Sequence, residues 1–145
     1  MLDDRDELCA LIPHAGSMCL LDRVTSWDAT QICCATGSHR RPGNPLRNEA
    51  GLSSLNGIEY GAQAIAVHGG LLARQQGATV APGYLASLRN VELQVDWLHD
   101  IASPLRVEAH CLQGDRHHFI YEFRVFAEAQ LLLAGRATIL VPRSA

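Results

Sequence analysis

Four polar residues stand in an apolar stretch near the middle of the sequence, at a spacing that chemistry could use. These residues are Asn56, Glu59, Tyr60 and Gln63. Because three or four positions separate them, they share one face if the stretch is helical. Burying a lone carboxylate is costly, so Glu59 should be paired, hydrogen-bonded or partly protonated, and a protonated carboxyl group could act as a general acid. The pattern equally allows a position at the rim of the helix, with Glu59 ion-paired to an arginine of a sheet.

The stretch that carries this polar face, from Leu55 to about Gln76, predicts one long helix. Ser53 or Ser54 can cap its start, and Gly77 can end it. Its other residues are mostly apolar, so we expect burial nearly all round. Glycines stand at positions 57, 61, 69 and 70, and each costs up to about 1 kcal/mol relative to alanine. Close packing against sheet backbone or a ligand should compensate for them.

Most of the remaining sequence has the two-residue period of strands that bury one face. Residues 18–27 and 31–37 predict a hairpin, and a loop follows over 38–54. Further strands are predicted near 91–97, 105–111, 119–125 and 130–141, with Gly135 as a possible bulge. Residues 8–12 should form one or two helical turns. This order predicts an α+β fold, one antiparallel sheet of about six strands with the helix across its concave face, as a single domain over residues 1–145.

Composition narrows the classes of function. A net charge of −3 gives no support for nucleic-acid binding, and polar residues interrupt the helix before it could span a membrane. The acidic N-terminus is unlike a secretory signal, and five irregularly spaced cysteines favour free thiols in a reducing cytoplasm. Neither CxxC nor HExxH occurs, so we predict no metal and no cofactor. His110, His117 and His118 are interpreted as strand histidines at a sheet surface or end.

Two segments resemble the bacterial 3-hydroxyacyl-[acyl-carrier-protein] dehydratases. Residues 12–24, IPHAGSMCLLDRV, resemble the opening "(L/I)PH…(M/F)LL(V/L)DRV" of that family, and residues 59–64, EYGAQA, are similar to its helix motif "EAMAQA". The form GIEYGAQA over 57–64 looks especially like the dehydratase-like subfamily of aryl-polyene and related pigment or lipid clusters. The resemblance implies the hot-dog fold, in which the sheet wraps around a long central helix and two sheets normally join edge to edge as a dimer.

The reaction that the resemblance implies is reversible loss of water from a (3R)-hydroxyacyl thioester to give a trans-2-enoyl thioester. The acyl chain would be carried by an acyl carrier protein or coenzyme A. In that family a carboxylate at the Glu59 position acts with a histidine contributed across the dimer interface. Backbone N–H groups over 55–57 would hold the developing enolate charge. We therefore expect Asn56, Gly57 and Gln63 to bind substrate.

The sequence departs from the family where the catalytic histidine should stand. Relatives carry it in an "HFPG.P.MPG" segment just before the helix, but residues 43–54, GNPLRNEAGLSS, contain no histidine. Asn44 or Pro45 occupies that place, and asparagine can orient a substrate or a water but cannot act as a base. His14, whose motif is retained, is the favoured replacement. His39 is the second candidate, although we expect it to be exposed in a loop, and His68 lies about 13 Å from Glu59 along the helix axis.

Three functions follow from these observations. The leading one is a dehydratase that acts as a homodimer or as a hot-dog heteromer in the cytoplasm, with no nucleic-acid or membrane partner. Hot-dog thioesterases share the helix and often its carboxylate, so thioester hydrolysis is the second. The third is a non-catalytic hot-dog partner subunit or acyl-binding protein, which the missing histidine favours.

Overall fold

A computed structural model describes residues 2–12, 18–78 and 83–142 of the chain. Six strands form one antiparallel sheet in the order β1-β2-β4-β5-β6-β3. The strands are β1 (Arg23–Trp27), β2 (Gln31–Thr36), β3 (Tyr84–Leu93), β4 (Leu105–Gly114), β5 (His118–Ala127) and β6 (Gln130–Leu140). The helices are α1 (Arg5–Cys9) and α2 (Gly57–Gln75), with 3-10 turns η2 (Ser38–Arg40) and η3 (Ser54–Asn56). No helix among the described residues is long and apolar enough to cross a membrane.

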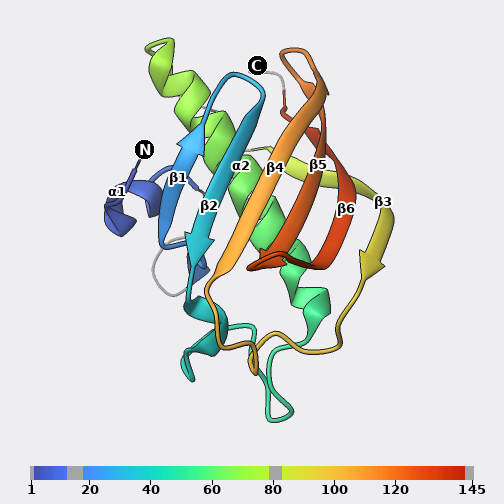
Figure 1. The fold of residues 1–145 in the computed structure, drawn as a ribbon. Coiled ribbons are helices and arrows are strands. Elements are labelled where there is room, and N and C mark those ends of the chain that lie inside the picture. Colours follow the sequence, from blue (N-terminus) through green and yellow to red (C-terminus); the bar gives the residue numbers. More distant parts are fainter. Residues whose placement is uncertain (1, 13–17, 79–82, 143–145) are drawn as a thin grey trace.

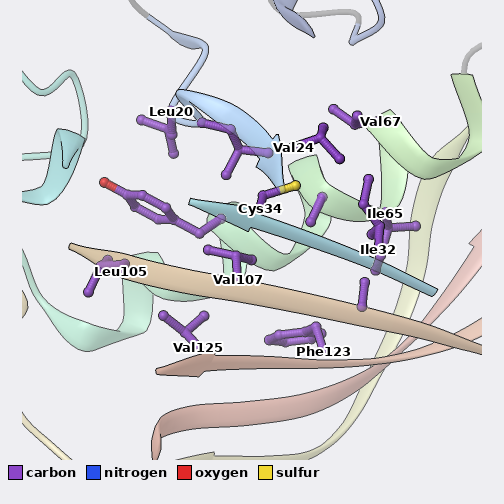
Figure 2. Packing of buried hydrophobic residues seen from close by; sticks show 14 of the residues in the cluster. Leu20, Val24, Ile32, Cys34, Ile65, Val67, Leu105, Val107, Phe123 and Val125 are labelled. Atoms are coloured by element: carbon purple, nitrogen blue, oxygen red, sulfur yellow. The ribbon is translucent and has the colours of Figure 1, made fainter. Parts of the chain in front are cut away.

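The long helix α2 lies across the concave face of the curved sheet, in contact mainly with β2, β4 and β5 (Figure 1). Figure 2 shows the core between them, where side chains of α2 meet those of the central strands. Phe123 and Val107 from the sheet and Val67 from the helix are fully or almost fully buried. The predicted architecture, one antiparallel sheet with a helix across its concave face, is therefore confirmed.

The ends of α2 agree with the sequence-based predictions, and the predicted close packing is found at Gly57, Gly61 and Gly70 but not at Gly69. Ser53 Oγ accepts from the backbone N–H of Leu55 at 3.2 Å, so it caps the 3-10 turn that leads into the helix. At the other end Gly77 has φ +70°, a conformation that glycine adopts without strain. Gly57 and Gly61 lie directly on the sheet, because a Cβ at either position would clash with Leu133 or Phe123. Since neither glycine has a side chain of its own, the first turns of α2 rest against the side chains of these two sheet residues.

Strand β3 differs from its prediction in both position and burial. The alternation over 91–97 predicts a strand with one buried face, but the strand spans Tyr84–Leu93 and lies at the sheet edge beside β6. Almost all of its residues are exposed, including Tyr84 at 55% and Leu93 at 44%. The alternating residues after the strand pair instead with the segment before the helix, where Ser54 N donates to the Asp96 carbonyl. One edge of the sheet therefore presents apolar side chains to solvent.

Three smaller predictions are also corrected. The first strand begins at Arg23 rather than Met18, because the backbone of residues 18–20 bonds to side chains of other elements. Gly135 pairs in register with Phe123 of β5, and the bulge lies opposite it on β3, between Arg89 and Glu92. The N-terminal helix spans Arg5–Cys9 rather than residues 8–12, because Asp4 caps it by accepting from two backbone N–H groups.

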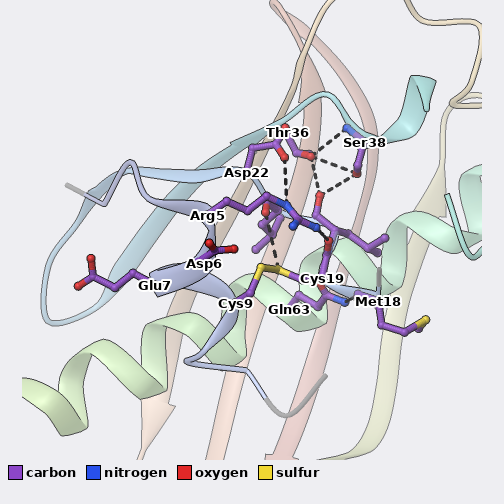
Figure 3. Close-up of a disulfide and its surroundings, with 12 residues drawn as sticks. Arg5, Asp6, Glu7, Cys9, Met18, Cys19, Asp22, Thr36, Ser38 and Gln63 are labelled. Carbon is purple, nitrogen blue, oxygen red and sulfur yellow. Dashed lines mark hydrogen bonds and ion pairs between the residues drawn. A yellow bond between two sulfur atoms is a disulfide. The ribbon is translucent and has the colours of Figure 1, made fainter. Parts of the chain in front are cut away.

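The expectation of five free thiols is wrong for two of them. Cys9 and Cys19 form a disulfide that joins the end of α1 to the segment before β1 (Figure 3), whereas Cys33, Cys34 and Cys111 are free. The pairing depends on tertiary structure, because α1 packs beside β1 and brings Cys9 next to Cys19. Cytoplasmic location stays a prediction, and these two cysteines no longer argue for it.

Candidate functional site

Glu59 lies in the first turn of α2. The side chain is half-buried, and its Oε1 accepts a hydrogen bond from Gln63 Nε2 at 3.2 Å. Among the described residues, no arginine or histidine nitrogen lies within 4 Å of its carboxylate. The alternative in which an arginine of the sheet neutralises Glu59 is therefore not what the structure shows. The carboxylate keeps acceptor positions that a reacting group could use.

Glu59 also heads a stripe of half-buried positions along α2. The stripe continues through Ala62, Ala66, Gly69 and Ala73, all of which are small. Residues on the adjacent sides of the helix, such as Tyr60 and Gln63, are buried against the sheet or the N-terminal segment. The expectation of burial nearly all round is therefore too strong within this chain. The carboxylate of Glu59 therefore lies on a side of α2 that the described part of the chain leaves partly uncovered.

Gln63 joins Glu59 to the segment that precedes β1. Its Oε1 accepts from the backbone N–H of Leu20 at 2.8 Å, and its Nε2 donates to the Met18 carbonyl at 2.7 Å. The second Nε2 hydrogen points to Glu59. Both donors and the acceptor oxygen of this buried amide are engaged within the chain. The predicted contact between Gln63 and substrate stays a prediction.

Asn44, which stands near the family's histidine position, anchors its loop to the helix. The amide nitrogen donates to the Ser38 carbonyl and to Tyr60 Oη, both at 3.0 Å, and Oδ1 accepts from Leu46 N at 2.9 Å. Tyr60 Oη also bonds to Ser38 Oγ at 2.8 Å, and burial raises the pKa of the Tyr60 phenol. Asn44 is itself buried. These bonds fix the loop and the first turns of α2 relative to each other.

The predicted oxyanion donors over 55–57 are occupied in this chain. Leu55 N donates to Ser53 Oγ, Asn56 N donates to the Ser53 carbonyl at 3.0 Å, and Gly57 N donates to the Ser54 carbonyl. The 3-10 turn makes these bonds because its backbone is wound more tightly than an α-helix. Asn56 is half-exposed, and its side chain makes a long bond of 3.5 Å to the Leu46 carbonyl. The structure therefore corrects the expectation that these three N–H groups are free to hold a thioester oxygen.

None of the histidines that the structure describes forms a hydrogen bond or ion pair with Glu59. His14 falls within 13–17, outside the described residues. His39 is fully buried and its Nε2 bonds to the Ile101 carbonyl at 3.0 Å, so the predicted exposed loop position is wrong. His68 is also fully buried and bonds to Tyr121 Oη and the Asp28 carbonyl, as its distance along the helix suggested. Burial lowers the pKa of both His39 and His68.

A cavity of about 490 Å³ lies beside the residues that anchor the start of α2. Its lining comprises Arg5, Cys19, Leu20, Ser38, Arg41, Gly43, Asn44 and Pro45. Asp22 pairs with Arg41 at 2.9 Å and lies 3.7 Å from Arg5, so it offsets part of the positive charge. In the part of the chain that the structure describes, no three histidine, cysteine or acidic side chains gather as they would around a metal ion.

The sequence matches the family model described as ApeP-like, ApeP dehydratase, over residues 7–145. The chain belongs to this dehydratase family. The predicted resemblance to hot-dog dehydratases is thereby confirmed. The match includes both motif segments, residues 12–24 and 59–64.

Solved structures share the fold of this chain. The chain is similar to one in the dehydratase heterocomplex ApeI:P from Xenorhabdus doucetiae, with a TM-score of 0.84 and 26% identity over 99% of this chain and 93% of that one. A thioesterase from Staphylococcus aureus shares the fold at a TM-score of 0.60 and 10% identity, covering 83% of this chain and 92% of its own. The E. coli PaaI protein of the phenylacetic acid degradation operon has a TM-score of 0.58 and 10% identity, with 81% and 80% covered. No curated protein matches the sequence.

For this member of the ApeP-like family, the sequence singled out Glu59 as a candidate site residue. It did not predict the hydrogen bonds of Gln63 that position the Glu59 side chain. The bonds from Gln63 to Met18 and Leu20 cross more than forty positions, so helical spacing could not reveal them. The Cys9–Cys19 disulfide beside those bonds was missed for the same reason. One signal was available, because a glutamine at i+4 from Glu59 can always bond back along the helix.

Proposed function

We propose that the chain is the carboxylate-bearing subunit of a hot-dog dehydratase, in which Glu59 acts with a histidine to remove water from a (3R)-hydroxyacyl thioester. The observation that carries the proposal is the state of Glu59, which is half-buried, fixed by a single bond from Gln63 and free of any cationic partner among the described residues. Membership of the ApeP-like dehydratase family gives the class of reaction.

We propose that a second, different hot-dog chain supplies the histidine. Residues 43–54 carry none, both ring nitrogens of His68 are bonded, and His39 is fully buried with its Nε2 bonded to the Ile101 carbonyl. The similar chain of known structure comes from an assembly named a dehydratase heterocomplex, which supports a heteromer rather than the homodimer. His14 is the candidate within this chain, and the variants below separate the two sources.

Two surfaces support a partner at this site. The stripe from Glu59 to Ala73 is half-buried and built from small side chains, which would let another backbone approach closely. Strand β3 presents an unpaired edge with exposed Tyr84, Leu88 and Leu93, and natural proteins seldom leave such an edge uncovered. A second hot-dog sheet pairing at β3 would cover both its apolar side chains and its free backbone groups.

The proposed chemistry needs one acid and one base on the two sides of the substrate. One member of the pair takes the proton α to the thioester carbonyl, and the other gives its proton to the departing hydroxyl, so water leaves and the pair ends with its protonation exchanged. Glu59 is held at the start of α2 by its hydrogen bond from Gln63. Because residues 55–57 use their own N–H groups, donors for the carbonyl would come from elsewhere in the assembly.

We propose a pantetheine thioester as the substrate class, carried by an acyl carrier protein or coenzyme A. The cavity beside Asn44 and Leu20 lies next to residues that bond to the first turns of α2. Arg5 and Arg41 line it, and guanidinium groups attract the phosphate of such an arm. Assays with the same acyl chain on each carrier distinguish the two.

The test is conversion of a 3-hydroxyacyl-carrier protein to its enoyl form, followed by mass spectrometry, for this chain alone and for its complex with a second hot-dog chain. We expect activity in the complex, and a loss of about 10²- to 10⁴-fold in E59Q. The matched control is E49Q, which changes an exposed glutamate in the preceding loop and should keep full activity.

Each alternative has its own signature in this assay. Loss of activity in H14A, with the partner's histidines intact, would place the histidine in this chain. Release of free thiol in place of water loss would identify a thioesterase. Full activity of the E59Q complex would make this chain a non-catalytic subunit, and a folded complex inactive on every acyl length would refute the dehydratase.

A further inference from the structure

The segment from Met18 to Leu20 forms no strand, yet it is held by five side chains from other elements, those of Gln63, Arg5, Ser38, Thr36 and Cys9. Gln63 bonds to both of its ends, at the Met18 carbonyl and the Leu20 N–H. Arg5 Nη2 donates to the Cys19 carbonyl at 2.7 Å, and Ser38 Oγ donates to the Leu20 carbonyl at 2.7 Å. Between them the disulfide from Cys19 to Cys9 ties the segment covalently to the end of α1 (Figure 3).

The same segment fixes the orientation of the Gln63 amide. The Leu20 N–H requires an acceptor, so Oε1 must face it, and the Met18 carbonyl requires a donor, so Nε2 must face that side. With the amide fixed in this way, the remaining Nε2 hydrogen is directed at Glu59 Oε1, 3.2 Å from the nitrogen. A shift of residues 18–20 would therefore turn or release the amide, and Glu59 would lose its one hydrogen bond from this chain's described residues.

We propose that Gln63 is a positioning residue for Glu59 and that the Cys9–Cys19 disulfide is a redox-sensitive brace that keeps Gln63 in place. The proposal rests on the proposed role of Glu59 in acid–base chemistry. With the disulfide formed, Cys19 is fixed to α1 and Glu59 is held for reaction. With it reduced, residues 18–20 keep their hydrogen bonds but gain freedom, so the Gln63–Glu59 bond is made for a smaller part of the time.

A dithiol reductant can break this disulfide by ordinary exchange. Cys9 is half-buried whereas Cys19 is 2% exposed, so the attacking thiolate reaches the sulfur of Cys9. A mixed disulfide forms at Cys9, and the Cys19 sulfur leaves as a thiolate and takes up a proton. The second thiol of the reductant then displaces Cys9, so two protein thiols form and the reductant becomes a disulfide.

The experiment compares oxidised and dithiothreitol-reduced protein, as the chain alone and in its active complex. Side-chain amide resonances of Gln63 and hydrogen exchange of the Leu20 N–H report on the brace without any activity. We expect both to change on reduction, and kcat to fall about 2- to 10-fold with KM nearly constant, as loss of one hydrogen bond implies. C9A/C19A should resemble the reduced protein and lose its response to reductant, whereas C111S, which changes a free thiol on β4, should keep the response.

Two results would overturn the proposal. One is alkylation of the native, unreduced protein at Cys9 and Cys19, which would show that the disulfide does not form. The other is an unchanged Gln63 resonance on reduction, in wild type and in C9A/C19A alike. If the complex has no dehydratase activity in either state, the proposed function fails, while the resonance and exchange measurements still decide whether the disulfide braces Gln63.

Discussion

Two polar clusters lie on the same helix, nine residues apart, and they differ in what they leave unused. Around His68, both ring nitrogens are bonded, at 2.6 Å to Tyr121 Oη and 2.8 Å to the Asp28 carbonyl, and the side chain is fully buried. Glu59 is half-buried and, among the residues that the structure describes, receives one hydrogen bond, from Gln63. A buried polar group whose bonds are all made stabilises a fold, whereas chemistry requires a group with a free acceptor and access. His68 therefore has the surroundings of a structural group, whereas Glu59 has those of a group that could react.

The largest expected effect is on activity and belongs to Glu59 alone. E59Q keeps the size of the side chain but removes its acid–base capacity, so kcat should fall about 10²- to 10⁴-fold while the melting temperature changes little. Steady-state kinetics and thermal unfolding of the same preparation measure the two quantities. A large loss of stability in E59Q would mean that Glu59 is structural, and the contrast with His68 would break down.

H68L should show the opposite behaviour. Leucine leaves the Tyr121 hydroxyl and the Asp28 carbonyl without their partner, so we expect the free energy of unfolding to fall by about 2–4 kcal/mol. At a temperature where the variant is folded, activity per folded molecule should stay near that of wild type. Chemical denaturation gives the stability, and an activity loss as large as that of E59Q would show that His68 takes part in the reaction.

Y121F tests the same cluster more gently. The substitution removes only the hydroxyl that bonds to His68 Nδ1, so the ring still packs against α2 and stability should fall by about 1–2 kcal/mol. The double variant Y121F/H68L should cost less than the sum of the two single changes, because both remove the same bond. Strict additivity in denaturation experiments would argue that the 2.6 Å contact contributes nothing.

The smallest effect is the dependence of stability on pH. Burial lowers the pKa of His68 and His39 below their ordinary value of about 6.5, so the folded state favours the neutral rings and the unfolded state binds protons first. The stabilisation is complete above pH 6.5 and is lost as the pH falls below it, by at most about 1.4 kcal/mol per pH unit for each group. H68Q should reduce this slope between pH 6.5 and 5. A slope identical to that of wild type would assign the dependence to other groups.

The long helix and the central strands follow from periodicity because their residues bury one face against each other, and burial is what a hydrophobic period records. The bounds of strand β3 did not follow from periodicity. The alternation over 91–97 continues past the strand into a segment that pairs with the loop before α2. Leu98, at the end of that segment, donates from its backbone N–H to the Leu52 carbonyl at 2.8 Å. The alternating pattern thus covers two different pairings, that of β3 with β6 and that of residues 96–98 with residues 52–54.

The candidate site also has features that the sequence predicts and features that depend on contacts between distant residues. Glu59 was predictable because an isolated carboxylate on an apolar helix requires an explanation, and the flanking motifs supplied one. The burial of His39 was not, because it depends on the carbonyl of Ile101, sixty-two positions along the chain. The bonds of Gln63 to residues 18–20 and the disulfide beside them are likewise products of tertiary structure.

Gly57 and Gly61 flank Glu59 in sequence, two positions before it and two after, and both rest directly on the sheet against Leu133 and Phe123. The sizes of those two sheet residues therefore set the depth at which the helix sits, and with it the height of the carboxylate above the strands. A change at Phe123, on β5 in the core, would displace Glu59 without touching it. Substitutions at such core positions should therefore change the turnover rate. Alanine at Gly61 should be tolerated only when a smaller residue replaces Phe123.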